Sequence, residues 1–144
     1  MKIIQTEIYK SPIKLKEPFV TSLGPVDHAE NIIVLIRTDE GITGFGECSP
    51  YMPINGENMD TCFIVAQYLA KALKGKDALQ IEDCITAMDR IITRNESIKS
   101  AFDMALYDMA SQHAGLPLYK FIGGANNKTI ITDYTVSIGE VDKM

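Results

Sequence analysis

Residues 101–124 read AFDMALYDMASQHAGLPLYKFIGG, the most regularly patterned stretch of the chain. With the residues just before it, its apolar positions step by three and one: Ile98, Ala101, Phe102, Ala105, Leu106 and Met109. That spacing places them on one face of an α-helix. Gly115 ends the predicted helix, and Pro117 stands where the first turn of a second helix would begin. The stretch holds no recognisable nucleophile or phosphate loop, so its pattern predicts packing rather than chemistry.

The first third of the chain predicts β-structure. Residues 2–10 (KIIQTEIYK) mix β-branched and polar residues at near-alternate positions, which suits a half-buried strand. Residues 31–47 (NIIVLIRTDEGITGFGE) carry two apolar runs around a turn at Gly41, which predicts a hairpin. Residues 16–30 (KEPFVTSLGPVDHAE) and 48–60 (CSPYMPINGENMD) show no periodicity and contain prolines, so we expect two irregular loops there.

The remainder of the chain predicts helices and one late strand. A helix capped by Asp60 ends before Gly75, and a second helix spans the apolar positions from Ile81 to Ile92. Residues 130–139 (IITDYTVSIG) are rich in β-forming residues but follow helices. The predicted fold class is therefore α+β: an antiparallel β-meander, a helical bundle against one face, and an isolated strand.

Composition excludes several classes of function. The 144 residues carry a net charge of −5 and no cluster of basic residues, which argues against nucleic-acid binding. No apolar run is long enough to cross a membrane, and no partner membrane is expected. The cysteines, Cys48, Cys62 and Cys84, form no CxxC pair, so we expect reduced thiols in a cytoplasmic protein.

Short motifs give little chemistry. Residues 44–49 (GFGECS) lack the third glycine of a dinucleotide loop, and glycines that ease a twisted strand explain them better. The histidines, His28 and His113, have no metal-ligand spacing with acidic residues or cysteines. His113 suits the C-terminus of a helix, whereas His28 lies in a long loop where it could contact a ligand. Asp108 is interpreted as an acceptor for the free N–H groups that begin the helix after Pro117.

The combination of these positions resembles a known family. Ala101-x-x-x-Ala105-Leu106-x-Asp108, then Gly115-x-Pro117-Leu118, then Phe121-x-Gly123-Gly124 is similar to a signature of the enolase superfamily, in its mandelate racemase/muconate lactonizing group. The resemblance implies an enolase-like N-terminal capping domain over residues 1–124. Residues 125–144 would then be the start of a C-terminal (β/α) barrel, cut off after its first strand.

The resemblance also implies where the chemistry lies. In that family, barrel lysines flank the substrate α-carbon and three acidic barrel residues hold Mg²⁺, so that a proton is abstracted beside a carboxylate. Those positions would lie beyond Met144, so the resemblance places no catalytic residue and no metal ligand in this chain. We therefore expect the 144 residues to be inactive alone and the intact protein to be an isomerase, and the family suggests a homo-oligomer.

Within the group, residues 16–24 (KEPFVTSLG) and 132–139 (TDYTVSIG) look most like the dipeptide epimerases. The resemblance assigns substrate-binding roles to Phe19, Gly24, Ile54 and Thr135, with cap loops at residues 17–30 and 50–58. Family members that act on Ala-Glu carry an arginine where this chain has Gly24, and no Lys or Arg occurs from Glu17 to Ile36. A buried carboxylate without a partner is costly, so we expect Ala-Ala or Ala-apolar dipeptides as substrates.

Two alternatives stay open at this point. The first is another member of the same group: a muconate cycloisomerase, an o-succinylbenzoate synthase or an N-acylamino acid racemase. The second is a stand-alone, non-catalytic domain. An isolated apolar strand at residues 130–139 is an aggregation liability, which favours a fragment of a longer protein over the stand-alone domain.

Overall fold

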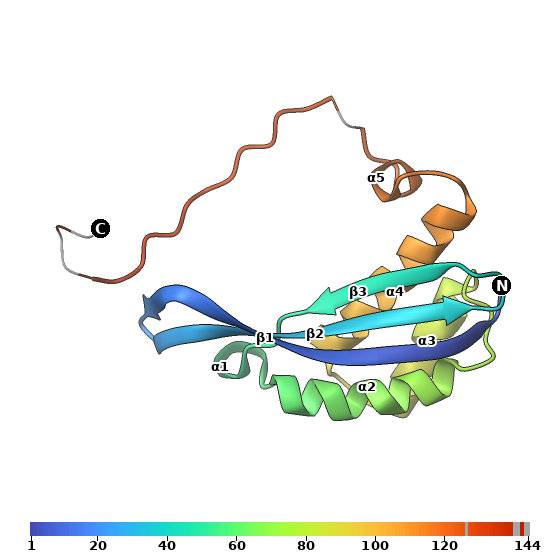
Figure 1. Cartoon of the computed structure of the whole chain (residues 1–144), viewed down its shortest axis with the longest axis horizontal. Coiled ribbons are helices and arrows are strands. Elements are labelled where there is room, and N and C mark those ends of the chain that lie inside the picture. The colour runs from blue at the N-terminus through green and yellow to red at the C-terminus, as the bar shows by residue number, and fades with distance from the viewer. Residues whose placement is uncertain (126, 140–141, 143–144) are drawn as a thin grey trace.

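The computed structural model describes residues 1–125, 127–139 and 142 (Figure 1). Its strands are β1 (Ile3–Thr21), β2 (Gly24–Thr38) and β3 (Thr43–Cys48). Its helices are α1 (Met52–Asn55), α2 (Met59–Leu73), α3 (Ile81–Ile91), α4 (Glu96–His113) and α5 (Leu118–Phe121). The strands form one antiparallel sheet in the order β1-β2-β3. The predicted α+β meander and helical bundle are confirmed.

The core lies between the sheet and helices α2, α3 and α4. Strand β2 alternates, with Ile32, Val34 and Ile36 fully buried and the residues between them partly exposed, so the helices cover one face of the sheet. From α4, Phe102 and Leu106 fill this core, as the spacing in residues 98–109 predicts. The patterned stretch is thus a packing element.

Glycines let α4 approach β3 closely. A Cβ atom at Gly46 would overlap the backbone carbonyl oxygen of Ala101, and one at Gly44 would overlap that of Ala105. The helix meets the strand here through the backbone of Ala101 and Ala105, with the Met109 side chain beside Gly44, so backbone lies nearly on backbone. The two glycines are in a strand and not in a phosphate loop, but the reason for them is this close approach rather than an eased strand twist.

The prediction for Asp108 is wrong. Its Oδ2 accepts a hydrogen bond from the backbone N–H of Phe45 in β3, at 3.0 Å, instead of from the helix that follows Pro117. Phe45 lies between Gly44 and Gly46, where α4 comes near enough for a short carboxylate to reach the strand. Asp108 therefore joins α4 to β3.

Residues 16–30 do not form the predicted loop. Strand β1 continues to Thr21, turns through Ser22 and Leu23, and returns as β2 from Gly24. We call residues 12–30 the hairpin arm, which projects beyond the helices and has no buried residue (Figure 1). Because neither face of the arm is buried, its sequence needs no alternation of apolar and polar residues. A register shift between Lys14 and Phe19 further interrupts any such alternation.

The N-cap of α2 is Asn58, not Asp60. The Asn58 side chain accepts a hydrogen bond from the backbone N–H of Thr61 at 2.9 Å, and the Thr61 hydroxyl accepts one from the N–H of Asn58 at 3.0 Å. This reciprocal capping box satisfies two backbone donors together. A single acidic residue in the first turn, as Asp60 is, offers only a favourable charge there.

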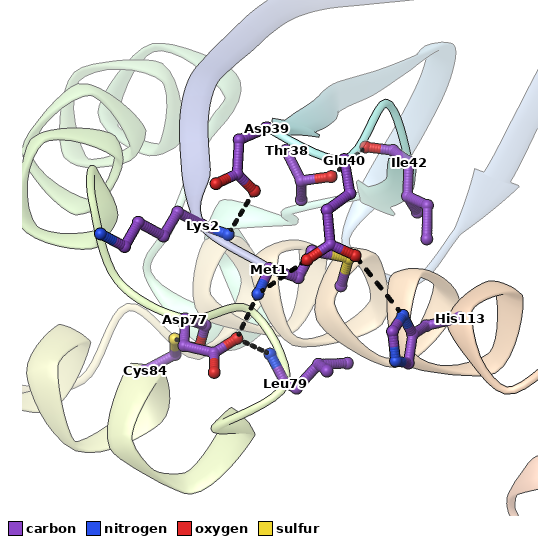
Figure 2. Close-up of polar contacts among 10 residues, drawn as sticks. All are labelled: Met1, Lys2, Thr38, Asp39, Glu40, Ile42, Asp77, Leu79, Cys84 and His113. Carbon is purple, nitrogen blue, oxygen red and sulfur yellow. Dashed lines mark hydrogen bonds and ion pairs between the residues drawn. The ribbon is translucent and has the colours of Figure 1, made fainter.

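Polar contacts close the end of the sheet opposite the arm (Figure 2). The Met1 ammonium lies 3.2 Å from a Glu40 carboxylate oxygen and 3.3 Å from one of Asp77. Asp77 also accepts a hydrogen bond from the Leu79 N–H at 3.1 Å. His113, at the end of α4, lies 3.8 Å from the other oxygen of Glu40. These contacts join the first residue, the β2–β3 turn, the α2–α3 loop and α4.

The strand predicted for residues 130–139 does not form. Residues 127–139 run extended and largely exposed, and Ile130 and Ile131 are 89% and 92% exposed. A strand needs a neighbour along its length, and the described residues offer this segment a backbone contact only near Ser137 and Ile138. The described part of the chain contains no helix that could cross a membrane. Its three cysteines are free and buried.

Candidate functional site: a cavity between the hairpin arm and α1

The hairpin arm and the segment around α1 enclose an open cavity of about 620 Å³. The arm lines it with Leu15, Phe19, Thr21, Leu23, Pro25, Val26, Asp27, His28, Ala29 and Glu30. The other wall consists of Ser49, Pro50, Tyr51, Met52, Pro53 and Asn58. Both predicted cap loops therefore meet at one site, although one of them is a hairpin. A mostly apolar hollow with a few polar groups is the usual form of a small-molecule site.

The charges at this cavity are negative. Asp27 and Glu30 bring carboxylates to the arm wall, and no lysine or arginine occurs among the described residues that line the cavity. His28 Nδ1 lies 2.9 Å from an oxygen of Asp27, and this contact lowers the pKa of the Asp27 carboxyl. A ligand carboxylate placed here would find no lysine or arginine partner among the lining residues.

The α1 wall is anchored to the core through the buried Glu57, which is 8% exposed. One Glu57 oxygen accepts a hydrogen bond from the Ser97 N–H at the start of α4 (3.3 Å), and the other accepts one from the Cys62 thiol (3.4 Å). Asn55, the last residue of α1, donates to the Ser97 hydroxyl at 2.8 Å. Between Asn55 and Glu57, Gly56 has φ of +75°, which ends α1 and lets the chain change direction.

Cys48 and Cys62 lie behind the same wall. The hydrogen bond with Cys48, together with burial, raises the pKa of the Cys62 thiol. The Cys62 thiol therefore stays protonated, donates to Glu57 and is a poor nucleophile. Cys62 is free and buried, as a reduced thiol that packs in the interior is.

The arm wall is held mainly by backbone pairing. Phe19 lies opposite Val26, and Thr21 lies opposite Gly24, on either side of the two-residue turn. The Thr21 hydroxyl donates to the Gly24 carbonyl at 3.2 Å and accepts from the Leu23 N–H at 3.1 Å. Gly24 has φ of +114°, which side-chain-bearing residues rarely adopt.

The predicted substrate residues fall in different places. Phe19 is half-buried and lines the cavity. Gly24 forms the turn of the arm, and Ile54 is 77% exposed and is not among the lining residues. Thr135 is exposed on the extended segment 127–139. The structure thus brings Phe19 to the cavity, whereas Gly24, Ile54 and Thr135 are not among its lining residues.

Sequence reasoning missed several lining residues. The sequence predicts an irregular loop around Leu23 and Val26, and its pattern does not single out Tyr51 or Met52. A usable signal was present: Phe19 and Val26 are symmetric about the Ser22-Leu23 turn, as cross-strand partners in a two-residue hairpin must be. The prolines at 18 and 25 hid that pattern, because proline disfavours strand interiors.

The described residues contain no group of three or more His, Cys, Asp or Glu side chains that could hold a metal ion. The carboxylates at the cavity, Asp27 and Glu30, lie on one wall only. These residues do not fit a Mg²⁺ site, and no step is assigned to a metal held by this part of the chain.

Residues 3–123 match the N-terminal domain of the mandelate racemase/muconate lactonizing enzyme family. The match covers most of the chain, so the chain belongs to this family. The family whose cap domain was expected from residues 101–124 is thereby confirmed, together with the capping-domain fold.

Three proteins similar to this chain are dipeptide epimerases. The chain is 61% identical over all 144 residues to a D-Ala-D/L-Ala epimerase of Cytophaga hutchinsonii, and it covers 39% of that protein. It is 39% identical to a hydrophobic dipeptide epimerase of Enterococcus faecalis and 40% identical to an L-Ala-D/L-Glu epimerase of Bacillus subtilis, again over its whole length. It covers 40% and 39% of these two relatives. The chain thus spans about two fifths of their length.

Solved structures of two of these epimerases share the fold of this chain. The Cytophaga hutchinsonii dipeptide epimerase, in a complex with Mg and D-Ala-L-Val, superposes with a TM-score of 0.96 over 99% of this chain and 39% of its own. The Enterococcus faecalis dipeptide epimerase, in a complex with Mg and L-Leu-L-Tyr, gives 0.91 over 97% of this chain and 39% of its own. The extended residues 127–139 fall within the first superposition, so their course resembles that in a longer protein.

Proposed function

We propose that the protein containing this chain is a Mg²⁺-dependent dipeptide epimerase, and that this chain is its cap. Support comes from the family match and from relatives that act on dipeptides. The cap contributes a wall of the substrate cavity, while the bases and metal ligands belong to a part outside these residues. The metal would supply the positive charge that stabilises the enediolate formed when the α-proton leaves.

The substrate we propose is a dipeptide with a small or apolar second residue, such as Ala-Ala. The single observation that carries this choice is the cavity lining, which is mostly apolar and holds two carboxylates and no lysine or arginine among its described residues. The side chain of a second-residue glutamate would be desolvated there without a partner and repelled by Asp27 and Glu30. Phe19 contributes an apolar surface to the wall that a valine or leucine side chain could contact.

The test is an epimerisation assay on the protein as the source organism makes it. Its intact mass is measured first, and α-proton exchange in D₂O with Mg²⁺ is then followed on Ala-Ala, Ala-Val and Ala-Glu. We expect a mass well above 15.9 kDa, and a kcat/KM for the two apolar dipeptides at least about tenfold above that for Ala-Glu, the factor that an unpaired buried carboxylate imposes. A tenfold preference for Ala-Glu would refute the substrate assignment.

A mass of 15.9 kDa without exchange would refute the enzyme assignment itself and favour the stand-alone domain. Exchange on N-acylated amino acids with none on dipeptides would favour another member of the family. Each outcome therefore separates one of the open alternatives.

A further inference from the structure

The tip of the hairpin arm has an open backbone edge. Strand β1 is at the edge of the sheet, with β2 as its neighbour. Near the tip, Val20 lies opposite Pro25, next to the Thr21–Gly24 pair that flanks the turn. Hydrogen-bonded and non-hydrogen-bonded pairs alternate in an antiparallel ladder, and the Val20–Pro25 pair is of the second kind because Pro25 has no N–H group to exchange. The polar groups of Val20 therefore face away from β2 and need partners from outside the hairpin, or water.

Those partners come from the far end of the chain. The Ser137 hydroxyl oxygen lies 2.8 Å from the Val20 nitrogen and accepts its hydrogen bond. The same oxygen lies 3.3 Å from the Val20 carbonyl oxygen, and the backbone N–H of Ile138 donates to that carbonyl at 3.0 Å. Residues 20 and 137 are 117 positions apart in the sequence. Figure 1 shows the extended C-terminal segment running from α5 back towards the end of the arm.

The position of this contact links it to the cavity. Val20 stands between Phe19 and Thr21, which both line the cavity. Because alternate residues of a strand point to opposite sides, fixing the Val20 backbone fixes the directions of both neighbours. The register shift just before Phe19 leaves β1 without regular pairing from Leu15 to Pro18, so little else holds this part of the strand.

We propose that Ser137 is a positioning residue, which fixes the tip of the hairpin arm and thereby sets the Phe19 wall of the cavity. A hydroxyl suits this role because it can both accept from the N–H and donate to the carbonyl of one residue. The effect on substrate binding rests on the proposed epimerase function; the effect on the arm does not.

The matched substitutions lie in the same segment. Ser137→Ala removes the hydroxyl, Ser137→Thr restores it, and Thr132→Ala removes an exposed hydroxyl that bonds to the neighbouring Asp133 carbonyl. All are made in the protein as the source organism makes it. Backbone hydrogen exchange at Val20 and steady-state kinetics with Ala-Val are measured on each.

We expect Ser137→Ala to accelerate exchange of the Val20 N–H by roughly fivefold to tenfold, the factor for losing one ordinary hydrogen bond. KM should rise by about the same factor with kcat nearly unchanged, because binding is lost equally from the ground state and the transition state. Ser137→Thr should recover both values, and Thr132→Ala should change neither.

Unchanged Val20 exchange in Ser137→Ala would overturn the proposal. Faster exchange with an unchanged KM would also overturn it, since Ser137 would then be structural only. If the parent protein has no epimerase activity, the proposed function fails. Protection of Phe19, Val20 and Thr21 in the exchange experiment then decides alone whether Ser137 fixes the tip.

Discussion

The packed half of the molecule and the hairpin arm share strands β1 and β2, but they are stabilised in different ways. In the packed half, β2 buries Ile32, Val34 and Ile36 against helices, and α4 lies directly on the glycines of β3. In the arm, residues 12–30 include no buried residue, and backbone pairing carries the structure. The packed half therefore fixes the fold through burial, whereas the arm presents a cavity wall that is held by backbone pairing.

The largest effect is expected where α4 meets β3. Gly46→Ala places a methyl group on the Ala101 carbonyl oxygen, and neither backbone can retreat without disturbing the core. We expect a loss of at least about 3 kcal/mol in the free energy of unfolding, measured by urea denaturation. Gly139→Ala is the control, because a Cβ there meets open space. Equal stability of both variants would show that the close approach does not support the fold.

Glu57→Ala tests the link between the two halves. It leaves the Ser97 N–H and the Cys62 thiol without their acceptor in a buried place, which costs about 1–3 kcal/mol. The same change should also loosen the α1 wall. The control is Glu17→Ala, which removes an exposed carboxylate from the arm. Both variants are compared by thermal unfolding. If Glu17→Ala were as destabilising as Glu57→Ala, Glu57 would not join the α1 wall to the core.

Phe19→Ala should affect substrate binding more than the free energy of unfolding. Phe19 is only half-buried, so its loss should lower the free energy of unfolding by about 1 kcal/mol or less. Phe102→Ala, in the packed half, should cost about 3–5 kcal/mol. The free energy of unfolding is measured by denaturation for both variants. The ratio of kcat/KM for Ala-Val to kcat/KM for Ala-Ala is also measured, and it should fall in folded Phe19→Ala but not in Phe102→Ala. A large stability loss in Phe19→Ala would mean that the arm is part of the core.

The smallest effect concerns pH at the end of the sheet. The Glu40 carboxylate, with a further contribution from Asp77, raises the pKa of the Met1 ammonium above its ordinary value of 8.0. A raised pKa stabilises the folded state fully below the unfolded value, and this contribution is lost as pH rises through the folded value. In a preparation that begins at Met1, Tm should therefore fall slightly more between pH 8 and 10 than in Glu40→Gln. Identical slopes would show that the contact contributes nothing.

At acidic pH the same cluster depends on Asp77. The Leu79 N–H and the Met1 ammonium lower the pKa of the Asp77 carboxyl, so its contribution is present above the unfolded value and is lost as pH falls. Asp77→Asn should accordingly flatten the acid side of the Tm profile. An unchanged acid side would place the stabilising charge elsewhere.

The sequence by itself determined the helical face of residues 98–109, the two strands around Gly41 and the family, because burial on one face imposes a period that can be read along the chain. It also showed that no lysine or arginine occurs from Glu17 to Ile36, since residue types are read directly from the sequence. These features depend on local spacing and composition.

Only the tertiary structure decided the partner of Asp108, the reason for Gly44 and Gly46, the hairpin at residues 16–30 and the contact between Val20 and Ser137. The Asp108, glycine and Ser137 contacts each depend on segments far apart in the chain coming within a few ångströms, whereas the hairpin is local but exposed. A strand exposed on both faces shows no alternation, and a close backbone approach shows only as a glycine with several possible meanings. The physical reason is that periodicity records burial within one element, whereas these contacts are fixed by how the elements pack together.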